Sequence, residues 1–226
     1  MNSTELYDLY RSDVVDFARP YLWSDDEVWR YMNEAYFMFV RLTGGIPDVM
    51  SDAANVPITA GEKYSPTDPS ILRIMSARRA SDGVEIKVIN STDLPMLRDN
   101  DYGRTRPIWM DESPGPVRYM LLGAQQHQVQ WLQVPLVDDS ANLVIHRLPL
   151  TKITGDGQDF VDVNEEHHFP LLYWMKALAY RKQDAETFDR AKSSENDALF
   201  RQYCFEAKAE LERKKHKTRV VAYGGL

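Results

Sequence analysis

The sequence SDDEVWRYMNEAYFMFVRLTGG, residues 24–45, contains the clearest helix signal of the chain. Its apolar residues recur at spacings of four and three, which places them on one helical face. These residues are Val28, Met32, Ala35, Phe39 and Leu42. Ser24 followed by Glu27 predicts a capping box at the start of the helix, and Gly44-Gly45 predicts its end. We therefore expect an amphipathic helix from Asp25 to about Thr43 with a buried apolar face.

A second apolar stripe on this helix contains Trp29, Tyr36 and Val40. Two stripes predict a helix that contacts neighbours on two sides. Aromatic rings are also enriched at protein interfaces. We therefore select Trp29, Tyr36, Trp109 and Trp174 as candidate residues of an interface with other protein chains.

Three further helices are expected outside this stretch. The first runs from about Thr4 to Ala18, because Leu6, Leu9, Tyr10, Val14 and Phe17 form one face, and it stops before Pro20. Another begins near Glu165, with Pro170 in or near its first turn, where a missing N–H costs little. The last runs from about Ala185 to Lys215. Its broken apolar stripe contains Phe188, Ala198, Leu199, Phe205 and Ala209.

Between residues 55 and 150 the apolar period changes from 3.6 to 2, which predicts an antiparallel β region. Residues 84–88 and 143–145 are predicted strands, and residues 117–122 and 128–134 are expected to form a hairpin. Asp82-Gly83 is a predicted tight turn. The stretch near 97–116 is rich in Asp, Arg, Pro and Gly, and we expect a long surface loop there.

This pattern predicts an α+β fold in which N- and C-terminal helices form a bundle with an inserted antiparallel β subdomain. The expected parts are the N-terminal bundle helices (1–54), the β subdomain (55–150), the C-terminal bundle helices (151–217) and an extended arm (218–226). The 226 residues, 43% of them hydrophobic, are enough for a sizeable core.

The charge pattern distinguishes the C-terminal end from the rest of the chain. The formal net charge is −7, which argues against general affinity for nucleic acid. In contrast, Arg213–Arg219 contains cations and no acid, which suits a helix C-terminus. An apolar, glycine-containing segment follows at Val220–Leu226. This segment either remains a free tail or docks into a partner, for instance as an added strand. Docking would remove its apolar side chains from water, where their exposure is unfavourable.

Signals for chemistry are weak. The Gly44-Gly45 and Gly155–Gly157 segments lack a phosphate-binding motif, and no serine lies in a nucleophile elbow. Cys204 lies in a helical pattern and is interpreted as a packed thiol. We predict no catalytic residues and no cofactor.

Two groups of residues are possible metal ligands, each with a simpler structural explanation. His167-His168 lacks a second histidine four positions away, so a contact at a helix start is favoured over a metal site. The acids between residues 156 and 166 lack the spacing of a calcium loop, and they suit the positive end of the following helix. No bound metal is predicted.

Nine segments of the chain carry a family resemblance: Leu9–Asp16, Pro20–Asp25, Asn33–Gly45, Ile71–Ile74, Arg147–Leu150, His167–Leu172, Trp174–Met175, Tyr180–Thr187 and Lys217–Leu226. They resemble a family of tailed-phage head-to-tail adaptors. The resemblance covers most of the chain, is weakest near 97–116 and includes no catalytic motif.

The single cysteine, Cys204, and the lack of a signal-peptide pattern predict a protein made in the cytoplasm. The resemblance implies a virion protein assembled as a ring, usually of twelve copies, on the portal. It implies that the β region faces a tail or nozzle protein and that genomic DNA passes through the ring without specific binding. The C-terminal segment would be an arm that reaches the portal. The candidate arm residues are Lys217, Arg219, Val220, Val221, Tyr223, Gly224, Gly225 and Leu226.

Two alternatives remain open at this stage. One is a virion-associated enzyme such as a cell-wall hydrolase, because a chain with 34 acidic residues contains many possible carboxylate pairs. The other is a different tail or head-completion protein. The N-terminus lacks the pattern of a signal peptide, and no apolar run reaches the length of a spanning helix, so no membrane partner is expected.

Overall fold

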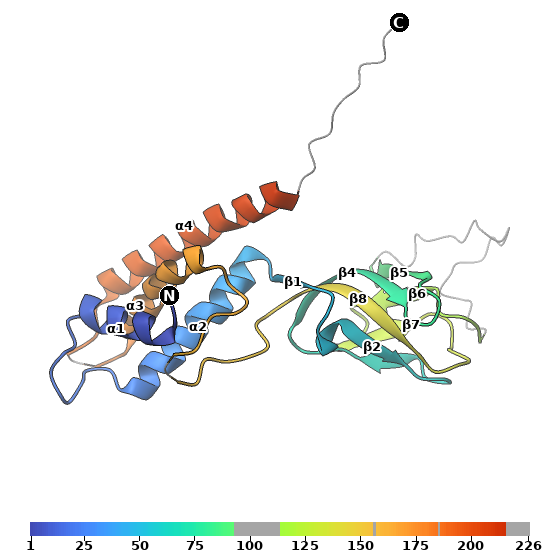
Figure 1. Ribbon diagram of the computed structural model, residues 1–226, viewed down its shortest axis with the longest axis horizontal. Coiled ribbons are helices and arrows are strands. Elements are labelled where there is room, and N and C mark those ends of the chain that lie inside the picture. Colours follow the sequence, from blue (N-terminus) through green and yellow to red (C-terminus); the bar gives the residue numbers. More distant parts are fainter. Residues whose placement is uncertain (93–113, 156, 185, 216–226) are drawn as a thin grey trace, which may run out of the picture. The chain divides into compact units, whose positions relative to one another are not determined.

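The structure is a computed structural model that describes residues 1–92, 114–155, 157–184 and 186–215. The described residues form a mixed α+β protein with four α-helices and a curled, eight-stranded sheet. The chain divides into two compact units (Figure 1). We call Met1–Gly44 with Pro149–Leu226 the helical unit, and Gly45–Leu148 the β unit. The expected α+β class is thus confirmed.

Helix α2 (Asp25–Thr43) has the boundaries that its sequence predicts. The Ser24 side chain accepts from the Glu27 N–H, and the Glu27 carboxylate accepts from the Ser24 N–H, which is the predicted capping box. Gly44 ends the helix with a φ of +99°, a left-handed conformation that glycine adopts readily.

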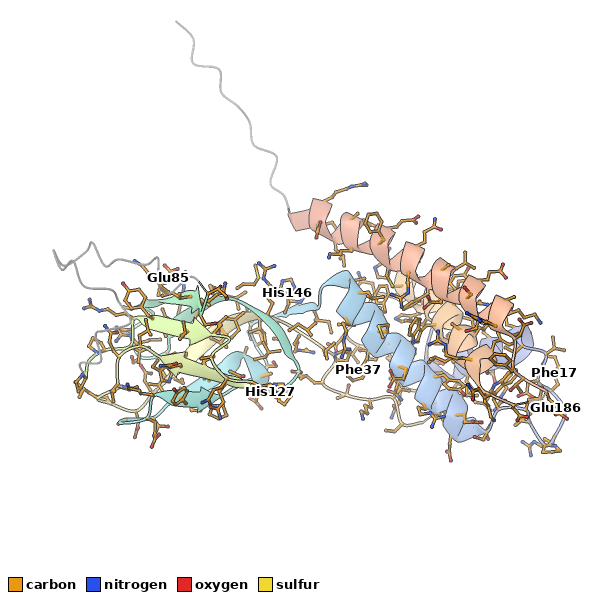
Figure 2. The ribbon with its side chains drawn as sticks, turned by 180° about the vertical axis from the view of Figure 1, so that it is seen from behind. Phe17, Phe37, Glu85, His127, His146 and Glu186 are labelled. Carbon is orange, nitrogen blue, oxygen red and sulfur yellow. The ribbon has the colours of Figure 1, made fainter. Side chains whose placement is uncertain are left out.

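Helix α1 (Ser3–Asp13) ends earlier than the predicted Ala18. Val15 has a φ of +57°, which takes the chain out of the helical path. The Asp16 side chain then accepts hydrogen bonds from the Leu22 and Trp23 N–H groups and therefore stabilises a loop instead of a further turn. Phe17, predicted to lie on the apolar helical face, is exposed beyond the end of α1 (Figure 2).

The two C-terminal helices begin at local signals. Helix α3 (His168–Arg181) follows a 3-10 turn, η4 (Glu165–His167), and Pro170 lies in its first turn as predicted. Helix α4 (Arg190–Lys215) begins after the predicted Ala185. The reason is local, because the Asp189 carboxylate accepts from the Lys192 N–H at 3.0 Å and caps the first turn.

The core of the helical unit is formed by the inner faces of these helices. The predicted face of α2 is buried at Val28, Met32, Ala35 and Phe39. Helix α2 packs against α3 and α4, whose buried apolar side chains include Leu171, Leu172, Met175, Phe200 and Cys204. Trp23 anchors the loop before α2, because its indole N–H donates to the Ala179 carbonyl at 3.1 Å.

The β unit contains eight strands and one 3-10 turn, η1 (Asp52–Ala54). The strands are β1 (Ile46–Asp48), β2 (Asn55–Ile58), β3 (Tyr64–Pro66), β4 (Ile71–Arg79), β5 (Glu85–Asn90), β6 (Tyr119–Leu122), β7 (Gln128–Trp131) and β8 (Asp139–Arg147). Their order in the sheet is β1-β8-β4-β5-β6-β7-β3, with β2 also paired to β8. The predicted hairpin is present, since β6 pairs with β7 antiparallel through Met120 opposite Trp131.

One strand pair differs from the expected antiparallel β region. Strands β5 and β6 are parallel, with Lys87 opposite Tyr119 and Asn90 opposite Leu122. Parallel neighbours require a crossover of about a dozen residues or more. The intervening stretch, 91–118, is long enough for one, and it contains the whole of the predicted surface loop near 97–116. Residues 93–113 lie outside the described part of the chain.

The core of the β unit is centred on Trp131, which is fully buried. Its indole N–H donates to the Ser65 hydroxyl at 2.9 Å, and that hydroxyl donates to the Pro57 carbonyl. These bonds connect β7 and β3, at one end of the sheet, to β2, which pairs with β8 near the other end. Apolar residues from all sides fill the space between, including Val56, Ile86, Met120, Leu143 and Ile145.

A buried ion pair fastens β1 to β8. The Arg147 guanidinium donates to the Asp48 carboxylate, and the two side chains are only 10% and 8% exposed. Asp48 also accepts from the N–H groups of Met50 and Ser51. Burial disfavours the ionised form, but the hydrogen bonds from Arg147, Ser51 and Met50 outweigh it and hold the pKa of Asp48 well below its usual range.

This shift predicts an acid-sensitive β unit. Because the folded pKa of Asp48 is depressed, its contribution to stability is present above the unfolded pKa of about 4 and is lost as the pH falls toward the folded pKa. We expect Asp48→Asn to lower the stability by about 1.5–3 kcal/mol at pH 7 and to flatten the profile below pH 4. Thermal unfolding between pH 2 and 7 measures this, with exposed Glu62→Gln as the control. Parallel profiles for Asp48→Asn and the wild type would contradict it.

Candidate protein interface

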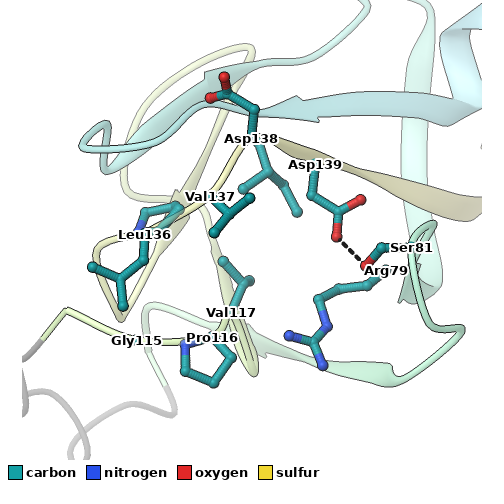
Figure 3. A pocket seen from close by; sticks show the side chains of 11 residues that line it. Arg79, Ser81, Gly115, Pro116, Val117, Leu136, Val137, Asp138 and Asp139 are labelled. Atoms are coloured by element: carbon teal, nitrogen blue, oxygen red, sulfur yellow. Dashed lines mark hydrogen bonds between the residues drawn. The ribbon is translucent and has the colours of Figure 1, made fainter.

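The β unit contains an open pocket of about 380 Å³ (Figure 3). Its apolar wall is formed by Ile58, Pro116, Val117, Leu136 and Val137. At the polar side, Ser81 donates to the Asp139 carboxylate at 2.6 Å. The Arg79 Nε is buried and has no hydrogen-bond partner among the described residues. Such a pocket, mostly apolar with a few polar groups, suits the docking of an apolar side chain.

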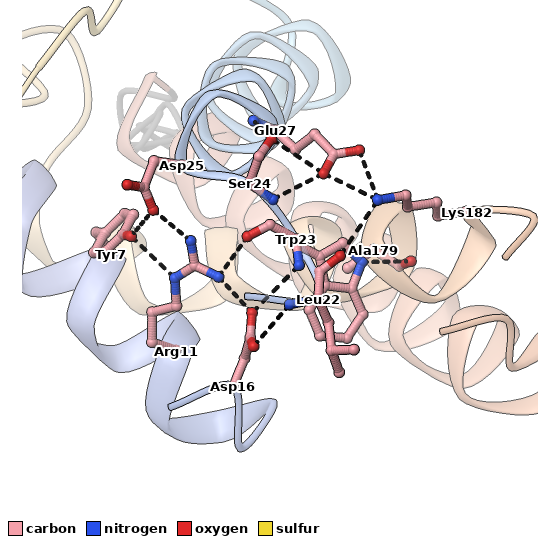
Figure 4. Close-up of polar contacts among 10 residues, drawn as sticks. All are labelled: Tyr7, Arg11, Asp16, Leu22, Trp23, Ser24, Asp25, Glu27, Ala179 and Lys182. Carbon is pink, nitrogen blue, oxygen red and sulfur yellow. Dashed lines mark hydrogen bonds and ion pairs between the residues drawn. The ribbon is translucent and has the colours of Figure 1, made fainter. Parts of the chain in front are cut away.

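In the helical unit, Arg11 is the centre of a buried polar network (Figure 4). One guanidinium nitrogen donates to the Asp16 carboxylate and to the Trp23 carbonyl at 2.7 Å. The other terminal nitrogen donates to Asp25 at 2.7 Å, and Nε donates to the Tyr7 hydroxyl at 3.0 Å. The planar fork of arginine matches these divergent acceptors, which a lysine ammonium would not.

This network fixes the loop of residues 14–24. Asp16 lies at the centre of the loop, where it binds Arg11 and accepts from the N–H groups of Leu22 and Trp23. The left-handed conformation of Val15 is unfavourable for a β-branched residue and persists only where the surroundings enforce it. The loop is therefore fixed in one conformation by its hydrogen bonds.

The fixed loop presents apolar side chains to water. Val15 and Phe17 are 73% and 67% exposed, whereas Asp16 between them is 3% exposed. Figure 2 shows Phe17 and Glu186 at one end of the helical unit. Rigidly held, exposed apolar residues are typical of protein-binding surfaces, because the loop loses little conformational entropy on docking.

The expected apolar stripe of the last helix lies on the outside of the helical unit. Phe188, Leu199 and Phe205 are exposed, and Ala198 is exposed as well. The buried face of α4 instead contains Ser193, Asn196, Phe200, Cys204 and Ala207. Ser193 and Asn196 are accommodated there because they donate to the Ala177 and Lys192 carbonyls. The stripe thus corresponds to surface that the helical unit leaves uncovered.

The four candidate interface residues, three tryptophans and one tyrosine, differ in location. Tyr36 is buried in contact with Phe160, and Trp174 is buried against Phe200, so neither ring is offered at the surface. Trp29 is partly exposed and stacks on Tyr7. Trp109 and all the candidate arm residues from Lys217 to Leu226 lie outside the described residues.

The residues considered for chemistry have structural contacts. His167 lies 2.9 Å from the Tyr203 hydroxyl, and burial lowers its pKa. Both ring nitrogens of His168 lie near carbonyl oxygens, those of Met1 and Val163. Burial raises the pKa of the Cys204 thiol to about 12, as expected for a packed thiol. Within the described ranges, no three His, Cys, Asp or Glu side chains gather as a metal ion would require.

Comparison with known proteins identifies one matching family. The family model described as SU10 adaptor protein matches residues 1–221. No curated protein matches the chain. None of the helices in the described residues is both long and apolar enough to cross a bilayer.

Proposed function

The chain belongs to the SU10 adaptor protein family, a family of phage head-to-tail adaptors, and on this premise we propose that it forms a dodecameric ring that joins portal to tail. The match over residues 1–221 is the observation that carries the proposal. The protein is a structural component of the virion. It is made in the host cytoplasm and incorporated at the head-to-tail junction. Its role in this proposal is structural and requires no catalytic step.

In this proposal the helical unit acts as a bundle and the β unit as a subdomain inserted into it. The exposed loop 14–24 and the outer side of α4 support assembly, because a single copy leaves Val15, Phe17 and Phe205 in water. A ring requires two different complementary surfaces on each subunit. The β unit, with its apolar pocket, faces the tail or nozzle protein.

The ring also lines the channel through which genomic DNA passes. The net charge of −7 supports passage without specific binding, because an acidic surface repels the phosphate backbone.

We expect the C-terminal segment to act as the portal-binding arm. Deleting Thr218–Leu226 should leave the thermal unfolding midpoint unchanged and weaken portal attachment by on the order of a hundredfold, because burial of two apolar side chains contributes about 3 kcal/mol or more. Binding to isolated portal by surface plasmon resonance measures this. Replacing Lys217 and Arg219 by Gln with the apolar residues kept separates the charged from the apolar contribution of the arm, and this variant should lose less attachment than the deletion. Unchanged attachment of the deletion variant would remove the arm from the proposal.

A further inference from the structure

The outer face of α4 carries an apolar ridge. Ala191, Ala198 and Phe205 lie seven positions apart, which is about two helical turns, so they share one face. All three are exposed, and Phe205 is 75% exposed. This face lies opposite the buried residues Phe200 and Cys204, which pack into the helical unit. A helix whose only neighbours are those of its own unit normally presents polar residues on this side.

Between Arg190 and Lys208, charges of opposite sign flank the ridge, whereas in the last turns Glu212 lies on the side of the first row described below and Arg213 on the side of the second. At about 100° per residue, Arg190, Arg201 and Lys208 align on one side of it. Glu195 and Glu206 align on the other side, eleven positions apart. All five side chains are exposed. We call these two rows the basic edge and the acidic edge of α4.

The two edges distinguish between modes of self-association. If two copies of α4 lie side by side in the same direction, the acidic edge of one helix faces the basic edge of the next. If they pair antiparallel about a two-fold axis, each edge faces its own kind, and like charges oppose association. The charge pattern therefore favours same-direction packing of neighbouring α4 helices over antiparallel pairing.

We propose that the outer face of α4 is a contact between copies of this chain, in which Phe205 is covered and the acidic edge of one copy meets the basic edge of its neighbour. The inference deepens the proposed ring and rests on it, since it names the surface and the direction of packing. The small side chains of Ala191 and Ala198 permit close approach of the neighbouring helix.

Charge reversal tests the contact because every copy carries both edges. Glu206→Lys or Lys208→Glu alone places like charges opposite each other at each contact. The double variant exchanges the charges of positions 206 and 208 and therefore restores an opposite-charge pair. Neither position is buried, so each variant is expected to fold, which circular dichroism verifies. Arg201 is left unchanged because it pairs with Asp197 and lies over Trp174.

The full-length variants are supplied to a phage lacking the gene, and copies of the chain per purified particle are counted by quantitative mass spectrometry. We expect each single reversal to lower the number of copies at least about tenfold and the double variant to recover to within about twofold, since about 1.4 kcal/mol corresponds to a factor of ten. Phe205→Ser should also lower it. Glu62→Lys, an exposed reversal in the β unit, should not.

Carbodiimide cross-linking of wild-type particles assembled from isotopically mixed copies locates the contact directly. We expect a Glu206–Lys208 cross-link between different copies. Three results would each contradict the α4 contact without contradicting the ring: single reversals that leave incorporation unchanged, a double variant that incorporates no better than either single one, or cross-linked particles that lack the Glu206–Lys208 linkage. Particles without a ring of this chain at the junction would instead overturn the proposed function.

Discussion

Arg11→Met is expected to destabilise the helical unit by about 3–5 kcal/mol, the range for removing one partner of a buried ion pair. The side chain of Arg11 is 6% exposed and that of Asp16 is 2% exposed. Methionine fills much of the volume but leaves the Asp16 carboxylate buried without its cation. The Trp23 carbonyl and Asp25 also lose a donor. Equilibrium denaturation followed by circular dichroism measures the change.

The nearby Arg19 provides the matched control. It lies in the same loop and is exposed, so Arg19→Met should change the stability by no more than about 0.5 kcal/mol. Arg11→Lys should fall between the wild type and Arg11→Met, because an ammonium retains the charge without the planar fork. An Arg11→Met variant within about 1 kcal/mol of the wild type would show that the network does not hold the loop.

Trp131→Ala should destabilise the β unit by a comparable amount, about 3–5 kcal/mol, through the cavity that it leaves. The ring is fully buried in the only large core of the described β unit, and its N–H binds Ser65. Replacement also leaves the Ser65 hydroxyl without the Trp131 donor. Urea unfolding monitored by amide hydrogen exchange in β3 and β7 separates this loss from changes in the helical unit.

Trp131→Phe separates packing from hydrogen bonding at this position. Phenylalanine retains most of the apolar surface and lacks the N–H, so we expect a smaller loss, about 1–2 kcal/mol. Exposed Tyr64→Ala in the adjacent strand β3 is the surface control. Equal stabilities for Trp131→Ala and Trp131→Phe would contradict a core centred on this ring.

Local signals predicted those elements whose boundaries are set within a few residues. Helix α2 is the clearest case, because the Ser24–Glu27 capping box and Gly44 determine both of its ends. The β6–β7 hairpin and Pro170 in the first turn of α3 are local in the same sense. Each of these features depends on hydrogen bonds or dihedral preferences between neighbours in the sequence.

Features that depend on particular side-chain contacts, or on partners far apart in the sequence, could not be predicted in this way. The early end of α1 requires Asp16 to bind the N–H groups of Leu22 and Trp23, a preference that apolar periodicity does not reveal. The parallel β5–β6 pair depends on how the chain returns after residue 90. In both cases tertiary contacts override the local period.

The candidate interface shows the same limit. Size and aromatic character singled out Tyr36 and Trp174, but large rings are as useful inside a core as at a contact, and both are buried. Two residues of the α4 ridge, Ala198 and Phe205, belong to the broken apolar stripe that the sequence predicts. Only the burial of Phe200 and Cys204 on the opposite side reveals that this stripe faces outward.

Electron cryo-microscopy of the intact phage particle, with this chain located by an antibody fragment or a fused tag, tests the adaptor assignment most directly. The account predicts a ring of copies of the chain, twelve in number, between the portal and the tail. A particle in which the label lies elsewhere, or in which the junction contains no ring of this chain, would contradict it.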